Sequence, residues 1–125
     1  MRSILFVGLG GAIGAIGRYL ISLFSVKGDF PFLTLLTNLL GAILIGVVVG
    51  LADSKANMPK NLILFLKTGV CGGFTTFSTF SLESLLLLEN GKHFLGSVYI
   101  VASVVLCILG VALGKYCSTK WLVQI

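Results

Sequence analysis

Four long apolar stretches dominate this chain, and each is close to the roughly 20 residues that a helix needs to cross a bilayer. They cover residues 4–24, 32–52, 62–88 and 94–116. Charged residues make up only 10% of the 125 residues, and the mean hydropathy is +1.10. A soluble protein of this size could not bury so much apolar surface. We therefore predict an all-α membrane protein in which residues 1–125 form one domain of four transmembrane helices.

The short connectors and the excess of basic residues predict how the helices pack and which surface the chain contacts. Short connectors favour antiparallel packing of successive helices. The net charge of +5 favours contact with lipid headgroups, so we expect a bilayer and no nucleic acid as partner. The basic residues flank both ends of the stretches with a modest bias, and the orientation of the chain is weakly specified. Lys67 lies just inside the third stretch.

Glycines spaced four apart recur in three of the four stretches. Such small-xxx-small faces let two helices approach closely in lipid, where packing drives association. We expect close helix packing at these pairs, which are Gly10 with Gly14, Gly46 with Gly50, and Gly110 with Gly114.

The third stretch contains CGGFTTFSTFSLE, in which several residues disfavour a continuous helix. Gly72 and Gly73 weaken a helix, and the β-branched Thr75 and Thr76 weaken it further. A broken helix exposes carbonyl and amide groups, which is tolerated at membrane depth only inside protein or beside a cavity or an ion site. We predict a break near residues 72–76, whose carbonyls are of the kind that hold a cation in other broken membrane helices.

Polar side chains in the other stretches also need partners, because ionisable and amide groups are costly in hydrocarbon. Arg18 either extends to the interface or places a fixed positive charge in a vestibule. Asn38 shares a helix face with Thr34, and its amide must find hydrogen-bond partners, for which a bond between helices is the simplest role. Glu83 is the only acid well inside the stretches; it either bonds backbone groups near the break or faces a vestibule. One stripe of the fourth stretch carries Tyr99, Ser103 and Cys107.

Two phenylalanines follow the predicted break, and hydroxyl groups lie between them. Phe77 and Phe80 are three residues apart, with Ser78 and Thr79 in between. The edge of a phenyl ring carries positive charge and can face an anion. Hydroxyl donors, ring edges and one arginine, without a carboxylate cluster, favour a small, strongly hydrated anion whose water must be replaced.

Three motifs resemble the small four-helix fluoride channels of the Fluc family, also called CrcB. They are GGAIGAIGRY, FLTLLTNLLGA and GVCGGFTTFSTFSLE, and the resemblance extends from Gly10 to Gly114. It implies an antiparallel, dual-topology homodimer in the cell membrane of a prokaryote, with two fluoride pores along the protomer interface. It also implies passive, selective export of cytoplasmic fluoride, which reduces fluoride toxicity.

The resemblance further implies roles for individual residues. A structural Na⁺ ion, which is not transported, would be held at the dimer centre by the backbone carbonyls of Gly72 and Thr75. Arg18 would lie in the vestibule. Cys107 departs from the family, because a hydroxyl is expected there and a thiol is a weaker donor. The pore residues would be Asn38, Phe77, Ser78, Thr79, Phe80, Tyr99, Ser103 and Cys107.

Three other classes of protein fit parts of the sequence. A proton-coupled small multidrug transporter needs a carboxylate in the membrane, and Glu83 would have to supply it. A fluoride/proton antiporter also needs a titrating group in the path. A small structural subunit would not need a break rich in hydrogen-bond donors. The sequence contains no general base, nucleophilic triad or phosphate-binding loop, so we expect no enzymatic activity.

Overall fold

The computed structural model describes residues 1–54 and 58–122, and all regular structure within them is helical. Four helical segments are long and apolar enough to cross a membrane: Arg2–Ser22, Phe32–Ser54, Lys60–Glu89 and His93–Lys120. The predicted all-α fold with four membrane-length helices is therefore confirmed. The chain is a multi-pass membrane protein.

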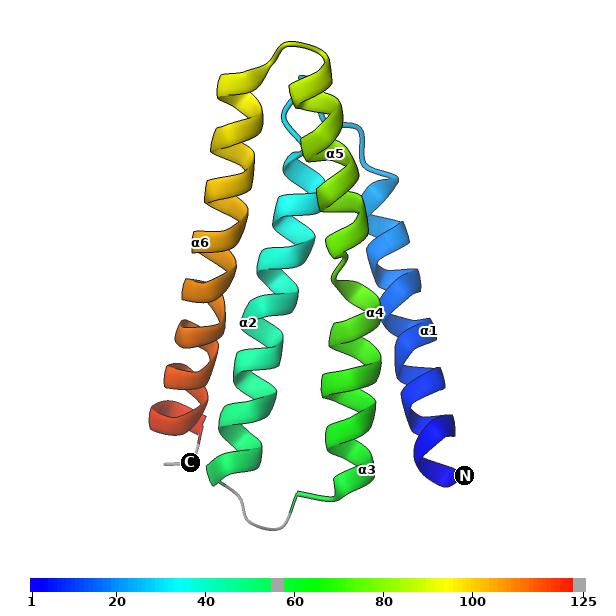
Figure 1. Cartoon of the computed structure of the whole chain (residues 1–125). Helices are drawn as coiled ribbons and strands as arrows, with labels where there is room; N and C mark the ends of the chain where they lie inside the picture. The colour runs from blue at the N-terminus through cyan, green and yellow to red at the C-terminus, as the bar shows by residue number, and fades with distance from the viewer. Residues whose placement is uncertain (55–57, 123–125) are drawn as a thin grey trace.

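The four segments run antiparallel in chain order, as Figure 1 shows. Helices α1 (Arg2–Ser22) and α2 (Phe32–Ser54) form the first two. The third joins α3 (Lys60–Ile63), the π-helical η1 (Leu64–Cys71), α4 (Gly72–Phe74) and α5 (Phe77–Glu89). The fourth is α6 (His93–Cys117), which continues into a second π-helical turn, η2 (Ser118–Leu122).

Glycines determine which helices pair. The main helix contacts are those of α1 with η1 and α4, and of α2 with α6. A Cβ atom added to Gly14 would lie 2.7 Å from the backbone nitrogen of Phe74. One added to Gly46 would lie 2.9 Å from the nitrogen of Lys115. The expected close packing along the glycine faces is confirmed, because a side chain there would overlap backbone of the neighbouring helix.

The turns at one end of the bundle are fixed by glycines and one ion pair. Gly28 and Gly91 have φ angles of 120° and 75°, which favour glycine. Lys92 Nζ lies 2.8 Å from an Asp29 carboxylate oxygen and joins the two turns. At the other end Lys115 Nζ lies 2.9 Å from Asp53. Both pairs are exposed, so they orient the ends and contribute little to stability.

The core lies between α2, α5 and α6. It contains Leu35, Phe80, Leu87 and Tyr99, of which Tyr99 is completely buried. Most apolar side chains of α1 and α6 point outward instead. Outward apolar faces suit contact with lipid or with other membrane-embedded protein, whereas the inner core packs α5 against α2 and α6.

Candidate functional site

The third segment is interrupted at two threonines (Figure 1). Helix α4 ends at Phe74, and Thr75 is extended, with φ −82° and ψ 156°. Thr76 is also extended, with φ −147° and ψ 113°, before α5 begins at Phe77. Gly72 and Gly73 remain helical, so the interruption falls on the β-branched pair, whose side chains suit extended backbone. Gly73 instead permits close packing, since an added Cβ would lie 3.0 Å from the Gly11 Cα.

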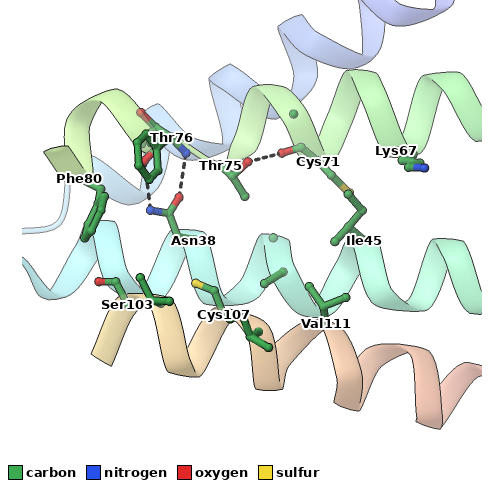
Figure 2. Close-up of a pocket in the computed structure, with 16 residues that line it drawn as sticks. Asn38, Ile45, Lys67, Cys71, Thr75, Thr76, Phe80, Ser103, Cys107 and Val111 are labelled. Atoms are coloured by element: carbon green, nitrogen blue, oxygen red, sulfur yellow. Dashed lines mark hydrogen bonds between the residues drawn. The ribbon is translucent and has the colours of Figure 1, made fainter. Parts of the chain in front are cut away.

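The side chain of Asn38 pairs with the interrupted backbone (Figure 2). Its Nδ2 donates to the Thr76 carbonyl at 3.1 Å. Its Oδ1 accepts from the Thr76 N–H at 2.7 Å. The amide thus makes the same two bonds that a neighbouring β-strand would make with an extended residue. Asn38 connects α2 to the interruption and satisfies backbone groups that would otherwise be costly in an apolar interior.

Two backbone carbonyls near the interruption lose their usual helical donors. In a continuous helix the Thr76 N–H would donate to Gly72 O, but it donates to Asn38. The Thr79 N–H would donate to Thr75 O, but it donates to the Thr76 hydroxyl at 3.2 Å. The Gly72 and Thr75 carbonyls therefore lose their helical partners. Their oxygens are left for another donor or a cation.

Arg18 reaches the same region from α1. Its Nε donates to the Gly73 carbonyl at 3.4 Å. The side chain is half-buried and lines a small cavity of about 70 Å³ with Thr34, Thr37, Thr76 and Thr79. Arg18 therefore places its charge beside the interruption, where it satisfies a carbonyl at the end of α4.

The hydroxyl groups after the interruption bond mainly to one another. Thr76 Oγ1 donates to Thr79 Oγ1 at 3.0 Å and lies 3.3 Å from Ser78 Oγ. Thr76 was not among the predicted site residues, although the TTFST motif contains it. Its hydroxyl caps α5, and this is a common use of threonine at the start of a helix.

Three aromatic rings follow one another from the interruption into the core. The Phe77 and Phe80 centroids are 5.4 Å apart at an interplanar angle of 48°. Phe80 and Tyr99 are also 5.4 Å apart, at 55°. Phe80 is 8% exposed, whereas Phe77 is 77% exposed. Phe80 is fixed by the core, and Phe77 presents its ring outward from a single chain.

Glu83 connects three helices through side chains. One carboxylate oxygen accepts from the Thr34 hydroxyl at 2.8 Å. The other accepts from the Tyr99 hydroxyl at 2.8 Å. The sequence left two roles open for Glu83, a bond to backbone near the break or a place at a vestibule; in the described residues both carboxylate oxygens bond to side chains, those of Thr34 and Tyr99. Glu83 also lines a separate cavity of about 330 Å³ beneath the turn at Asp29.

A larger groove of about 440 Å³ runs beside the interruption (Figure 2). Two residues of the predicted α6 stripe line it: Ser103, which is buried, and Cys107, which is half-buried. Tyr99 of the same stripe does not line it. Ser103 Oγ is buried and has no hydrogen-bond partner in the part of the chain that the structure describes. The other polar or aromatic residues along the groove are Asn38, Lys67, Cys71, Thr75, Thr76, Phe77 and Phe80.

The groove thus unites part of the predicted site. Asn38, Phe77, Phe80, Ser103 and Cys107 share it with the backbone at the metal positions predicted from the resemblance, Gly72 and Thr75. Thr79 lines the small cavity beside Arg18 instead. Ser78 lines neither of these two cavities. The groove can offer a hydroxyl, a thiol and aromatic rings to a small solute, between largely apolar walls.

Comparison with known proteins assigns the family. Residues 5–115 match the profile described as "CrcB-like protein, Camphor Resistance (CrcB)". The chain belongs to this family. A CrcB relative from Ruminiclostridium cellulolyticum, named "Fluoride-specific ion channel FluC", is 48% identical over 92% of this chain and 91% of its own. Relatives of the same name from Granulibacter bethesdensis and Agrobacterium fabrum are 49% and 44% identical. Their alignments cover 86% and 92% of this chain, and 87% and 98% of those relatives.

Proposed function

We propose that the protein is a fluoride-selective channel that exports cytoplasmic fluoride passively. The observation that carries this proposal is the buried Ser103 hydroxyl, which lines the groove without a protein partner. A small anion that loses its water there needs such donors. The names of the CrcB relatives support fluoride as that anion.

In this proposal the groove residues replace the hydration of the ion in steps. Ser103 donates an O–H, Cys107 a weaker S–H, and Phe80 a ring edge. Asn38 has both amide atoms bonded to Thr76, so its main contribution is to hold the interruption open beside the groove. Several weak sites in sequence bind the ion without trapping it, as conduction requires.

We also propose that a second, inverted copy covers the groove. Phe77 and Gly72 both line the groove. Phe77 is 77% exposed in the single chain, and Gly72 is exposed as well. An antiparallel dual-topology homodimer would enclose both residues and give two pores. The weak charge bias along the sequence agrees with chains inserted in both directions. Following the family resemblance, we place this dimer in the plasma membrane of a prokaryote.

A structural Na⁺ ion fits the residues at the interruption. Hard cations prefer oxygen ligands, and the Gly72 and Thr75 carbonyls are among those that lose helical donors at the interruption. Among the described residues no group of three His, Cys, Asp or Glu side chains could hold a metal. When bound, the ion would supply positive charge that compensates these carbonyls and links two protomers. It would stay in place while fluoride moves through the groove.

Export needs no chemical step, because the ion gradient and the membrane potential drive it. An inside-negative potential favours anion exit by about 2.3 kcal/mol per unit charge for each 100 mV. The protein's role is to lower the dehydration barrier, so we propose a channel without enzymatic activity.

Fluoride efflux from liposomes tests this function. We expect rapid fluoride efflux that requires a potassium ionophore for charge balance and does not require proton movement. Phe80→Ile should strongly reduce the efflux rate and leave the oligomer intact. Phe94→Ile is the matched control, since Phe94 is 83% exposed at the start of α6, away from the groove. Efflux that requires proton exchange would indicate an antiporter and contradict the proposed channel. Unchanged efflux in Phe80→Ile would show that this ring does not contact the permeating ion.

A further inference from the structure

Lys67 lies along the groove, well before the interruption (Figure 2). It belongs to η1, and its side chain is exposed. Cys71 and Thr75 follow at four and eight residues and also line the groove. Lys67 therefore stands on the groove-facing side of the third segment, at the far end from Phe80.

Its charge is not neutralised by an acid. Asp29 and Asp53 form ion pairs with Lys92 and Lys115. Glu83 accepts hydrogen bonds from Thr34 and Tyr99. Glu89 ends α5, on the other side of the interruption. Within residues 1–54 and 58–122, Lys67 thus has no ion-pair partner, unlike the lysines that fix the ends of the bundle.

Depth along the segment makes this charge unusual. Lys67 is seven residues after Lys60, so it lies at most about 10 Å further along the helix axis, the distance that the α-helical rise of about 1.5 Å per residue would give. A cation placed in hydrocarbon at that depth is costly unless it faces water or an anion. The groove provides such a place. A charge in a low-dielectric cleft also raises the local concentration of ions of opposite sign.

We propose that Lys67 is a positioning residue that concentrates the permeating anion at its end of the groove. The inference rests on the proposed anion conduction and extends it to a residue that the family motifs do not include. It differs from the role of Arg18, which bonds the Gly73 carbonyl and lines the small cavity. At this entrance Lys67 would bind fluoride weakly. The ion would lose its water further along the groove, at Ser103 and Phe80.

The test measures fluoride efflux against fluoride concentration for the reconstituted protein and Lys67→Gln. At 10 mM ionic strength, the half-saturating fluoride concentration should rise about twofold to fivefold, the factor that one charge at about 4–10 Å gives in water. The maximal rate should change little. At 1 M potassium glutamate the difference should vanish, because the Debye length falls from about 30 Å to about 3 Å. Lys67→Arg should retain the wild-type concentration dependence.

Lys60→Gln is the matched control, because it removes the same charge from the start of the same segment. Lys60 lines none of the cavities described above. Equal behaviour of Lys67→Gln and Lys60→Gln at low ionic strength would overturn the proposal and assign Lys67 to lipid headgroups. Lys67→Met serves if the glutamine variant does not assemble. Absence of fluoride efflux in the wild-type protein would instead refute the proposed function.

Discussion

The pairing of Asn38 with Thr76 predicts a large effect of Asn38→Ala. The substitution removes the acceptor of the Thr76 N–H at 2.7 Å and a donor to the Thr76 carbonyl at 3.1 Å. As the residue that caps α5, Thr76 keeps one carbonyl bond within the first turn of that helix. Its N–H has no such alternative while Thr75 and Thr76 remain extended.

The expected loss follows from these two bonds. A buried polar group left without a partner costs about 1–3 kcal/mol. The Thr76 N–H without a partner should account for most of the lost stability, and the Thr76 carbonyl with one bond fewer for the remainder. We expect the free energy of unfolding to fall by about 2–4 kcal/mol on these magnitudes. If Thr76 instead donates again to Gly72 O, the helix becomes continuous and fluoride efflux should be lost.

Denaturant titration of the detergent-solubilised protein, followed by helical circular dichroism, measures the free energy of unfolding. Fluoride efflux is measured in parallel on reconstituted samples. Thr37→Ala is the control, because this adjacent hydroxyl donates only to Leu33 O within its own helix, at 2.7 Å. If Asn38→Ala matched Thr37→Ala in both stability and efflux, the amide would not be needed to hold the interruption.

Two further substitutions test the packing and the polar core. Gly14→Ala should lower the free energy of unfolding by about 1–3 kcal/mol through overpacking against Phe74, measured by the same titration. Gly8→Ala, where an added Cβ meets nothing within 4 Å, should not, and equal effects would contradict glycine-driven pairing. Glu83→Ala should cost about 1–3 kcal/mol because it leaves the buried Tyr99 hydroxyl unpaired. Glu83→Gln, which keeps an acceptor, should lower the melting temperature less than Glu83→Ala does. Equal melting temperatures of these two variants would argue against the bond between Tyr99 and Glu83.

Sequence patterns predicted the parts of the fold that depend on residue type alone. Apolar length marked the four spans, and glycine spacing marked the helix faces in close contact, because both express local chemistry. The position of the interruption was less predictable. Gly72 and Gly73 disfavour a helix in isolation, yet both are helical, and Gly73 packs against Gly11 of α1.

Partners distant in sequence were the part of the site that the sequence could not specify. Glu83 was placed correctly as the inner acid, but its bonds to Thr34 and Tyr99 depend on how α2 and α6 lie beside α5. Tyr99 and Ser103 share one stripe, but only Ser103 lines the groove. Lys67 was visible as a charge inside a span, and only the fold shows that it faces the groove.

The two extended threonines let one segment change neighbours halfway through the bundle. Before them, η1 and α4 pack on α1; after them, α5 packs mainly on α6. The groove lies where the segment changes neighbours, and Phe77 and Phe80 of α5 line it at one end. A straight rod over residues 60–89 could keep only one of these neighbours. In 125 residues, the chain thus obtains a groove beside its third segment from one interruption of the backbone, without an added loop.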